Sequence, residues 1–594
     1  MHILGISCYY HDAAAALIED GRLVAAAQQE RFSRRKHDPS YPAEAIEFCL
    51  RQAGITPGDL DYVVFYEKPF AKVERIISTV LATFPRSLQV FREALLVLLK
   101  EKFWIKDRIR QHLGMDPARI LFVEHHLSHA ASAFFCSPFR EAAILKVDGV
   151  GEWTTAAVGF GTADWTGDGK NAITLSHELR FPHSLGLLYS AFTAFLGFEV
   201  NEGEYKVMGM APYGEPRYAD QVARLLDLRE DGSFRLDMDY FSYHYHLERS
   251  FDPRLEALLG PPRDPRARFV TARTSLYDDP TPPTREELER NQRYADIAAS
   301  IQHVTEEVLI RMATHLYETT RCPSLSMAGG VALNSVANYK MLRRTPFTEL
   351  FIQPAAGDAG GALGAALYAY HVLLAKPRNF ILEHAYWGEA YEPAAVAAAV
   401  GRVGFPWEEI EDDEVLLDRV VEALLQGKVV GWFQGRFEWG PRALGNRSIL
   451  ADARQERMKD LVNIKIKFRE PFRPFAPSVL EDAAERYFDI PDAKRHYPAR
   501  FMLYVAPVKG PEIPATTHVD GTGRLHTVQR DLNPRYARLL EKFGQATGIP
   551  VVLNTSFNLK GEPIVTTPAN ALDTFARSGM DLLVLGNTIV GKRA

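Results

Sequence analysis

Two histidines lie four positions apart in the segment His125-His126-Leu127-Ser128-His129, which continues in good helix formers. Residues four apart on a helix share one face, with Cβ atoms roughly 5–6 Å apart, so His125 and His129 can bind one metal ion. His126 can replace His125 in that pair, because positions three apart also share a face. Two imidazoles do not complete a metal site, so carboxylate ligands are expected elsewhere in the chain.

Two aspartates follow predicted strands, at positions where they can join the histidines. Asp148 comes directly after the apolar run 142–147, and Asp358 follows residues 349–354 and a glycine-containing turn. In open α/β folds, ligands bind just beyond the carboxyl ends of strands, and neighbouring glycines let the backbone approach a ligand closely. Two imidazoles with carboxylates and without thiolates suit Fe(II), Mn or Zn. The alternative for each aspartate is an ordinary turn before glycine.

A second group of residues that could bind a ligand or take part in a reaction lies in the C-terminal third. Arginines and lysines alternate with glycine, proline and aromatic residues over 435–448 and 465–475. Such loops project guanidinium groups that match phosphate oxygens in a fork, whereas a solvated helix face pairs its cations with acids four positions away. Asn554 and Ser556 add short polar groups after a predicted strand at 551–553. We expect a polyanion site here; a plain surface cluster and an RNA-binding surface are the alternatives.

The elements that must position the histidines and aspartates follow one pattern twice. Strands are expected at 3–7, 13–18, 23–28, 62–65, 142–147 and 155–160. Asp20-Gly21 is a hairpin signal between two of them, and an Asp-Gly turn follows the strand that begins near Ala142. A strand that reaches a polar turn and returns as a hairpin therefore occurs in both halves. This duplication is typical of the actin-like phosphate-binding fold, in which two turns flank a nucleotide phosphate.

A glycine pair follows a later predicted strand at 325–328. Gly329 and Gly330 lead from it toward Asn334 and a helix. Backbone N–H groups at such a turn can bind phosphate or ribose, and close packing of the backbone is the alternative. Residues 70–114 are expected to be helical, and residues 260–284 to form an exposed loop.

The bulk composition is that of a soluble globular protein. A chain of 594 residues and 66.7 kDa is too long for one hydrophobic core, so roughly three to four domain-sized units are expected. The net charge of −6 argues against a nucleic-acid partner. No apolar run approaches the ~18 residues of a membrane span, no secretory signal is evident, and the four scattered cysteines indicate no disulfide framework. A cytoplasmic enzyme without a membrane partner is expected.

Six segments taken together are far more specific than any one of them. They are His11-Asp12 with Ala13-Ala14-Ala15, His125–His129, Glu202–Gly214, Gly329–Asn334, Gly440–Ser448 and Arg469–Pro477. In combination they resemble the bacterial O-carbamoyltransferases, enzymes that modify antibiotics and nodulation lipo-oligosaccharides. The resemblance covers essentially the whole chain.

The resemblance implies an actin-like N-terminal domain at 1–375, a linker at 376–394 and a YrdC-like α/β domain at 395–594. The C-terminal domain would react carbamoyl phosphate with ATP, giving carbamoyl-adenylate and pyrophosphate, with Mg²⁺ expected beside the triphosphate. The adenylate would pass to the N-terminal domain, where a hydroxyl of a natural product or sugar-containing acceptor attacks the carbamoyl carbon and AMP leaves. A homodimer is plausible.

The same resemblance assigns residues to the two sites. In the N-terminal domain, the match gives the iron-type ligands His125, His129, Asp148 and Asp358. His11 is the candidate general base, since an unperturbed imidazole pKa of about 6.5 suits that task; its alternative role is to cap backbone. The remaining N-terminal candidates are the acceptor or nucleotide contacts Glu204, Lys206, Gly329, Gly330 and Asn334.

In the C-terminal domain the match gives a phosphate-binding set. Its members are Arg442, Lys467, Arg473, Arg524, Asn554 and Ser556. Lys467 and Arg473 are the candidate catalytic groups, because joining two polyanions requires their charges to be neutralised. A tRNA-modifying enzyme of the carbamoyladenosine type shares these parts and should carry a basic RNA-binding face, which the sequence does not show. A non-catalytic actin-like scaffold, the third alternative, needs no such pair of sites.

Overall fold

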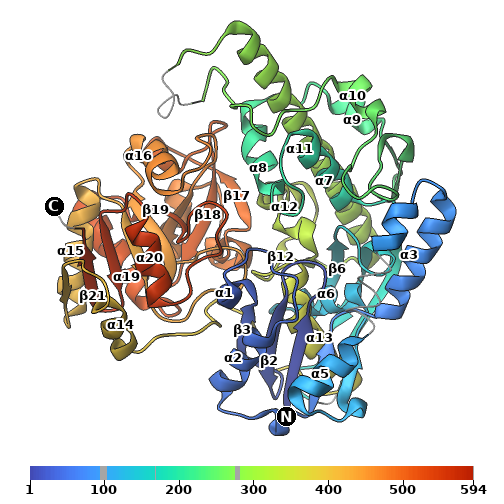
Figure 1. Cartoon of the computed structure of the whole chain (residues 1–594), viewed down its shortest axis with the longest axis horizontal. Helices are drawn as coiled ribbons and strands as arrows, with labels where there is room; N and C mark the ends of the chain where they lie inside the picture. Colours follow the sequence, from blue (N-terminus) through green and yellow to red (C-terminus); the bar gives the residue numbers. More distant parts are fainter. Residues whose placement is uncertain (94–103, 168, 275–280, 593–594) are drawn as a thin grey trace. The chain divides into compact units, whose positions relative to one another are not determined.

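The computed structural model describes residues 1–93, 104–167, 169–274 and 281–592 (Figure 1). The expected helix at 70–114 and the expected loop at 260–284 fall in part on 94–103 and 275–280, outside the described residues. The chain forms two compact units. Unit 1 comprises Met1–Gln29, Pro39–Thr271 and Arg285–Leu382, and unit 2 comprises Glu30–Asp38, Ala272–Thr284 and Glu383–Ala594. Unit 2 therefore includes a segment from the N-terminal part of the sequence.

The first sheet of unit 1 has five strands in the order β3-β2-β1-β4-β5. Its strands are β1 (His2–Ser7), β2 (Ala14–Glu19), β3 (Arg22–Gln28), β4 (Tyr62–Phe65) and β5 (Ile120–Phe122). Strands β1 to β3 are antiparallel, whereas β4 runs parallel to β1 and β5 parallel to β4. Asp20 and Gly21, with φ of +46° and +81°, form the hairpin turn that the sequence predicts.

The second sheet of unit 1 repeats this topology, in the order β12-β11-β6-β7-β8. Its strands are β6 (Glu141–Val147), β7 (Thr154–Thr162), β8 (Ala172–Arg180), β11 (Ser324–Ala328) and β12 (Glu349–Phe351). Again three antiparallel strands are followed by two parallel ones on the other side of the first strand. The predicted duplication and the actin-like fold class are thereby confirmed.

Two short helices at the centre of unit 1 carry most of the candidate metal ligands. Helix α6 (His125–Phe134) packs on α13 (Asp358–Tyr368), which also contacts β1, β2 and β4. The helices cross closely because Gly364 has no side chain: a Cβ there would lie 1.8 Å from the carbonyl oxygen of Ser128. This close crossing places the amino end of α13 beside the histidine face of α6.

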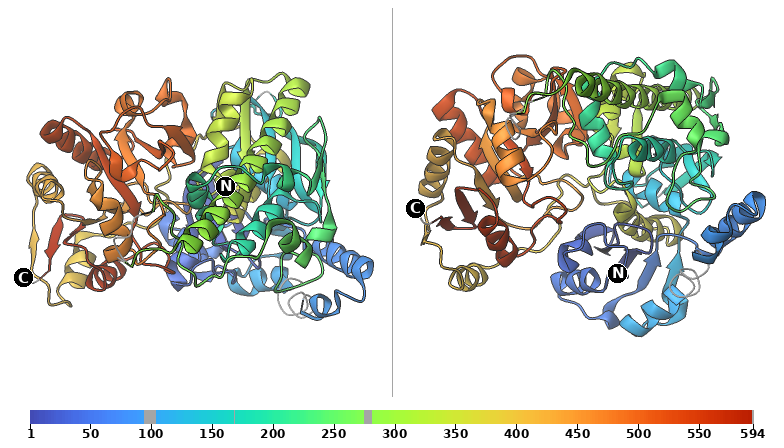
Figure 2. Two further views of the ribbon diagram at one scale, coloured as in Figure 1. Left: turned by 90° about the horizontal axis from the view of Figure 1, so that it is seen from above. Right: turned by 45° about the horizontal axis from the view of Figure 1, so that its top comes forward.

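The other helices of unit 1 surround the two sheets. The described ones are α2 (Ala43–Ala53), α3 (Pro69–Thr83), α5 (Ile105–Leu113), α7 (Leu185–Phe195), α8 (Glu204–Met210), α9 (Ala219–Ala223), α10 (Pro253–Leu259), α11 (Arg285–Thr320) and α12 (Ser335–Arg344). Figure 2 shows α11, in light green, as a long rod against which α7, α8 and α12 pack. A two-stranded sheet pairs β9 (Leu226–Leu228) with β10 (Phe234–Leu236). No described helix is long and apolar enough to cross a membrane.

Unit 2 is built on a nine-stranded mixed sheet in the order β13-β21-β20-β14-β15-β19-β16-β18-β17. The strands are β13 (Trp407–Glu409), β14 (Val430–Phe433), β15 (Arg447–Asp452), β16 (Ala476–Leu480), β17 (Tyr504–Pro507), β18 (Thr522–Val528), β19 (Val551–Ser556), β20 (Leu582–Leu585) and β21 (Thr588–Gly591). The helices are α1 (Glu30–Ser33), α14 (Pro393–Val400), α15 (Asp413–Leu425), α16 (Arg457–Leu461), α17 (Ala484–Tyr487), α18 (Tyr497–Arg500), α19 (Pro534–Thr547) and α20 (Pro568–Ala576). The α/β class predicted for this part of the chain is confirmed.

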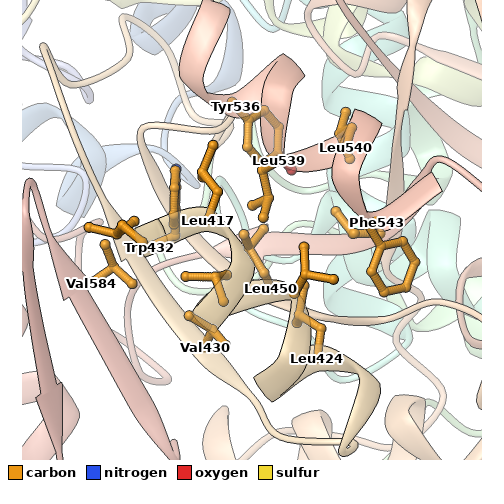
Figure 3. Close-up of a cluster of buried hydrophobic side chains, with 14 of the residues drawn as sticks. Leu417, Leu424, Val430, Trp432, Leu450, Tyr536, Leu539, Leu540, Phe543 and Val584 are labelled. Carbon is orange, nitrogen blue, oxygen red and sulfur yellow. The ribbon is translucent and has the colours of Figure 1, made fainter. Parts of the chain in front are cut away.

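A core of buried apolar side chains fixes the sheet of unit 2. Strand residues Val430, Trp432 and Leu450 face α15 and α19, which supply Leu417, Leu424, Leu539, Leu540 and Phe543 (Figure 3). Full burial of each large apolar side chain stabilises a fold by roughly 1.5–3 kcal/mol. This packing gives the neighbouring strands β15 and β19 a rigid base from which their polar ends project.

Candidate functional site

The four candidate metal ligands come together in unit 1. His125 and His129 project from α6, Asp148 follows the last residue of β6, and Asp358 begins α13. All four side chains are buried, and their donor atoms lie within 4.8 Å of one another. The i, i+4 spacing thus brings the two Nε2 atoms within 3.0 Å of each other, as the helical face predicts.

The distances within this cluster fit a single metal ion. His125 Nε2 and His129 Nε2 lie 2.9 and 3.2 Å from Asp148 Oδ2. Asp358 Oδ1 lies 3.3 Å from His129 Nε2 and 3.7 Å from His125 Nε2. Bonds of about 2.0–2.2 Å to a common centre put neighbouring donors roughly 3.0–3.5 Å apart. The donor set of two imidazoles and two carboxylates is one that Fe, Mn and Zn accept.

Backbone groups hold Asp148 in place. Its Oδ1 accepts hydrogen bonds from the backbone N–H groups of Gly149, at 2.8 Å, and Gly330, at 3.1 Å, which leaves Oδ2 facing the histidines. Gly329 has φ of +95°, and a Cβ there would lie 2.2 Å from the carbonyl oxygen of Val147. The predicted glycine pair therefore packs against the end of β6 and anchors a metal-ligand candidate; its predicted contact with nucleotide remains a prediction.

The charges of the cluster suit a cation. Burial alone raises the pKa of Asp148, but the charge of Lys146 and the hydrogen bonds with His125 and His129 hold it well below its usual range. Burial alone lowers the pKa of the His129 imidazole. Its hydrogen bonds with Asp148 and Asp358 outweigh this effect, so the pKa of His129 is raised. Protonation of imidazole balances the buried carboxylates, and a bound divalent cation would displace that proton.

Two residues near the cluster, His126 and Tyr66, differ from what the sequence indicates. His126 lies outside the cluster, with Nε2 3.3 Å from Glu124 Oε2, so the structure places His125 and not His126 beside His129. Tyr66 was not a sequence candidate, yet its hydroxyl donates to Asp358 Oδ2 at 3.4 Å. It directly follows β4, so the strand-end rule that identified Asp148 could have found it.

His11 lies in the connection between β1 and β2. Its Nδ1 is 3.0 Å from Asp12 Oδ2, and its ring packs against Tyr10 with centroids 4.6 Å apart. Burial alone lowers the pKa of His11, but the charge of Asp358 and the hydrogen bond with Asp12 outweigh it and raise the pKa to about 9. A metal ion that offsets the charge of Asp358 would lower this pKa toward the range of a general base.

We expect the His11 imidazole of the metal-free chain to titrate at about 9 and to titrate at lower pH when Zn²⁺ is bound. Because the pKa is raised, the protonated form stabilises the fold fully below the unperturbed value of about 6.5, and this contribution is lost as the pH rises through the folded pKa. The measurement is NMR of ring-labelled histidines, with the signal assigned through His11→Gln. A metal-free midpoint near 6.5 contradicts the prediction.

The predicted contacts Glu204, Lys206 and Asn334 are engaged within unit 1. Glu204 Oε1 accepts from Ser190 Oγ at 2.8 Å and from the backbone N–H of Asn201 at 3.0 Å. Lys206 Nζ lies 5.6 Å from the centroid of a phenylalanine ring. Asn334 caps α12 through its side-chain oxygen and exchanges hydrogen bonds with a buried glutamine of α11. Roles for these three in binding acceptor or nucleotide remain predictions.

Lys467 is the centre of the candidate site in unit 2. Its Nζ donates to the carbonyl oxygens of Ser556, at 2.7 Å, and Asn558, at 2.8 Å, and lies 3.2 Å and 2.6 Å from their side-chain oxygens. The side chain is buried. Burial lowers its pKa well below the usual range, and the charges of Arg469 and Arg473 lower it further. A polyanion bound here would offset these effects and favour the charged form of Lys467.

The other predicted residues of unit 2 lie on its strands and on the loops between them. Asn554, on β19, donates to the carbonyl oxygen of Ala443 at 3.2 Å and so ties the loop that carries Arg442 to the sheet. Arg473 pairs with Glu470 at 3.4 Å. Arg524 lies on β18. The structure brings Lys467, Ser556 and Arg473 together. Asn554 contacts Ala443, the residue that follows Arg442 in the sequence.

Two residues that the sequence reasoning missed lie in a short segment of unit 2 that comes from near the N-terminus. Lys36 lies in the Glu30–Asp38 segment of unit 2, and its charge helps to lower the pKa of Lys467. Arg34 of the same segment donates to the carbonyl oxygens of Pro563 and Ile564. Nothing in the local sequence indicates that residues so close to the N-terminus belong to unit 2.

Glu438 organises the arginine-bearing loop. Its buried Oε1 accepts from the backbone N–H groups of Leu444, Asn446 and Arg447 at 2.8, 2.9 and 3.1 Å. Three converging backbone donors form a nest for one carboxylate oxygen. The Gly440–Ser448 segment is therefore held rigidly from inside, with Arg442 on it.

Residues 2–367 match the family described as carbamoyltransferase N-terminus, and residues 421–592 match the carbamoyltransferase C-terminus. The Synechocystis protein sll1178 is 46% identical over 100% of this chain and 97% of its own. Nodulation protein NolNO of Sinorhizobium fredii is 38% identical over 98% of this chain and 79% of its own. The 3'-hydroxymethylcephem-O-carbamoyltransferase of Streptomyces clavuligerus is 33% identical over 44% of this chain and 48% of its own.

Proposed function

Since this chain belongs to the carbamoyltransferase family, we propose that it is an ATP-dependent O-carbamoyltransferase with two active sites. Unit 2 forms carbamoyl-adenylate from carbamoyl phosphate and ATP. Unit 1 transfers the carbamoyl group to a hydroxyl of a natural product or sugar-containing acceptor. The observation that carries the proposal is the buried cluster of His125, His129, Asp148 and Asp358, which stands beside His11 in the duplicated actin-like fold.

In unit 2, carbamoyl phosphate is hydrolysed to carbamate and phosphate. A carbamate oxygen then attacks the α-phosphorus of ATP, and pyrophosphate leaves with the electrons of the broken P–O bond. Lys467, with Arg442, Arg473 and Arg524, neutralises the charge of the two polyanions. Buried cations that are already in place stabilise the transition state without reorganisation. Mg²⁺ bound with ATP would offset the charge of the departing pyrophosphate.

In unit 1, the acceptor hydroxyl oxygen attacks the carbamoyl carbon, and AMP leaves with the electrons of the carbon–oxygen bond. His11 accepts the hydroxyl proton once its imidazole is neutral. His125, His129, Asp148 and Asp358 would hold Fe²⁺, or Mn²⁺ or Zn²⁺ in its place. A metal ion bound there would supply Lewis acidity toward phosphate and carbamoyl oxygens.

The test is incubation of the full chain with ATP and carbamoyl phosphate, alone, with tRNA, or with a panel of aminoglycosides, β-lactams, polyketides and sugars. We expect equal amounts of phosphate and pyrophosphate, and a mass gain of one carbamoyl group on an accepted compound. Carbamoylation of tRNA with no reaction of any small acceptor would assign the tRNA-modifying activity instead. No release of pyrophosphate under any of these conditions contradicts the adenylation step.

A further inference from the structure

The amino end of α6 is held by a carboxylate from the loop that carries Asp148. Glu152 accepts hydrogen bonds from the backbone N–H of His125, at 3.0 and 3.2 Å to its two oxygens, and from the backbone N–H of Lys68, at 2.8 Å. The side chain is buried, with 4% of its surface exposed. Glu124, the N-cap residue of α6, makes no capping bond with its side chain. Glu152 therefore supplies an acceptor that the first turn of the helix lacks.

The same loop also packs against the imidazole of His125. A Cβ on Gly151 would lie 2.8 Å from Cδ2 of that ring, so the ring rests on bare backbone. Asp148 meets the ring at Nε2, 2.9 Å away. The loop from Asp148 to Glu152 thus contacts His125 at the metal-facing nitrogen, at the ring and at the backbone.

The usual means of orienting a metal-bound imidazole is missing here. A histidine that binds metal through one ring nitrogen commonly donates the other N–H to a carboxylate or carbonyl oxygen. The Nδ1 atoms of His125 and His129 are buried and have no hydrogen-bond partner among the described residues. The orientation of His125 consequently depends on its backbone and on the surface against which its ring packs.

We propose that Glu152 is a positioning residue of the metal centre, with Gly151 as its partner in holding the His125 ring. By accepting from the first N–H of α6, Glu152 links the loop of Asp148 to the helix of His125 and His129, so three of the four ligands keep one mutual arrangement. A carboxylate at a helix amino end is also favoured by the helix dipole. The inference rests on the proposed metal centre.

The experiment measures the dissociation constant for Co²⁺ of the full, metal-stripped chain by competition with a chelator, together with the visible Co²⁺ spectrum. For Glu152→Ala we expect the constant to rise by about 10- to 100-fold, the usual effect of removing an outer support of a metal ligand. Glu152→Gln keeps an acceptor oxygen, so it is expected to recover most of the affinity. Gly151→Ala, which displaces the ring without changing charge, should weaken binding as well.

Glu124→Ala is the matched control. It removes a carboxylate from the same helix end, where Glu124 pairs with Lys68 and His126 and makes no cap bond with the backbone of α6. We expect it to bind Co²⁺ as the unsubstituted chain does. Unaltered affinity and spectrum in Glu152→Ala overturn the inference, and so does an equal loss in Glu124→Ala, which would assign the effect to charge alone. Failure of the unsubstituted chain to bind Co²⁺ is a distinct result, because it overturns the metal centre itself.

Discussion

Lys467→Ala is expected to reduce the pyrophosphate release that depends on carbamoyl phosphate by about 10²- to 10³-fold. Lys467 Nζ is buried between oxygens of Ser556 and Asn558, beside the charge of Arg473. Removal of Lys467 leaves the phosphates of ATP and carbamoyl phosphate without the most buried cationic side chain of the proposed site. The measurement is a coupled pyrophosphate assay at saturating ATP, with the folded state checked by circular dichroism. Lys467→Met, which preserves most of the side-chain volume, should lose as much activity.

Lys465→Ala is the matched control for this prediction, because Lys465 lies two residues away on the same segment and is exposed. It is expected to retain the pyrophosphate release of the unsubstituted chain. Carbamoyl-adenylate supplied from outside should still be used by Lys467→Ala, since unit 1 is unchanged. Full pyrophosphate release by Lys467→Ala would show that adenylation takes place without this lysine.

His129→Ala is expected to abolish metal binding and carbamoyl transfer while leaving adenylation intact. His129 Nε2 faces both Asp148 Oδ2 and Asp358 Oδ1, so its removal takes away a central donor of the cluster. Loss of a supporting residue alone costs about 10- to 100-fold in metal affinity, so loss of a ligand should cost more than about 100-fold. The measurements are metal content by mass spectrometry, carbamoylated product, and the initial burst of pyrophosphate.

His126→Ala tests whether this effect belongs to the cluster. His126 is a neighbour on the same helix and lies against Glu124, outside the cluster. Its metal content is expected to equal that of the unsubstituted chain. If the metal content of His129→Ala is unchanged, the proposed ligand role of His129 is wrong. If His129→Ala loses pyrophosphate release as severely as carbamoyl transfer, the proposal that unit 1 transfers and unit 2 adenylates is wrong.

The duplicated topology of unit 1 could be predicted because its signals are local. Apolar runs and the Asp20-Gly21 turn are visible within a few residues, and the turn adopts the positive φ angles that the pair favours. Strand β8 was not predicted. Several of its residues are exposed, so its sequence lacks the apolar run that marked its partners. A register shift interrupts the alternation of apolar and polar residues that marks a half-exposed strand. The pairing of β7 with β8 contains two such shifts.

The gathering of the four candidate metal ligands could be predicted from spacing and strand ends, but the residues that support them could not. His125 and His129 share a helical face, and Asp148 follows a strand, so each carries a local signal. Glu152 matters because it accepts from the backbone of a residue 27 positions away, and Tyr66 because its hydroxyl contacts a side chain 292 positions away. Contacts of this kind depend on how helices and sheets pack. The same holds for Lys36: no sequence pattern near residue 36 predicts that its charge acts on Lys467.

The membership of Glu30–Asp38 in unit 2 has a consequence for any attempt to divide the protein. A fragment that starts at Glu383 lacks the helix α1 and its anchors: Arg31 donates to the carbonyl oxygen of Gly440 at 2.7 Å, and Thr566 Oγ1 donates to the carbonyl oxygen of Arg31 at 2.6 Å. Truncation would expose the surfaces that this segment covers and remove Lys36, whose charge acts on Lys467 in the proposed adenylation site. Because unit 2 includes residues from both ends of the sequence, a single cut cannot separate the two proposed activities.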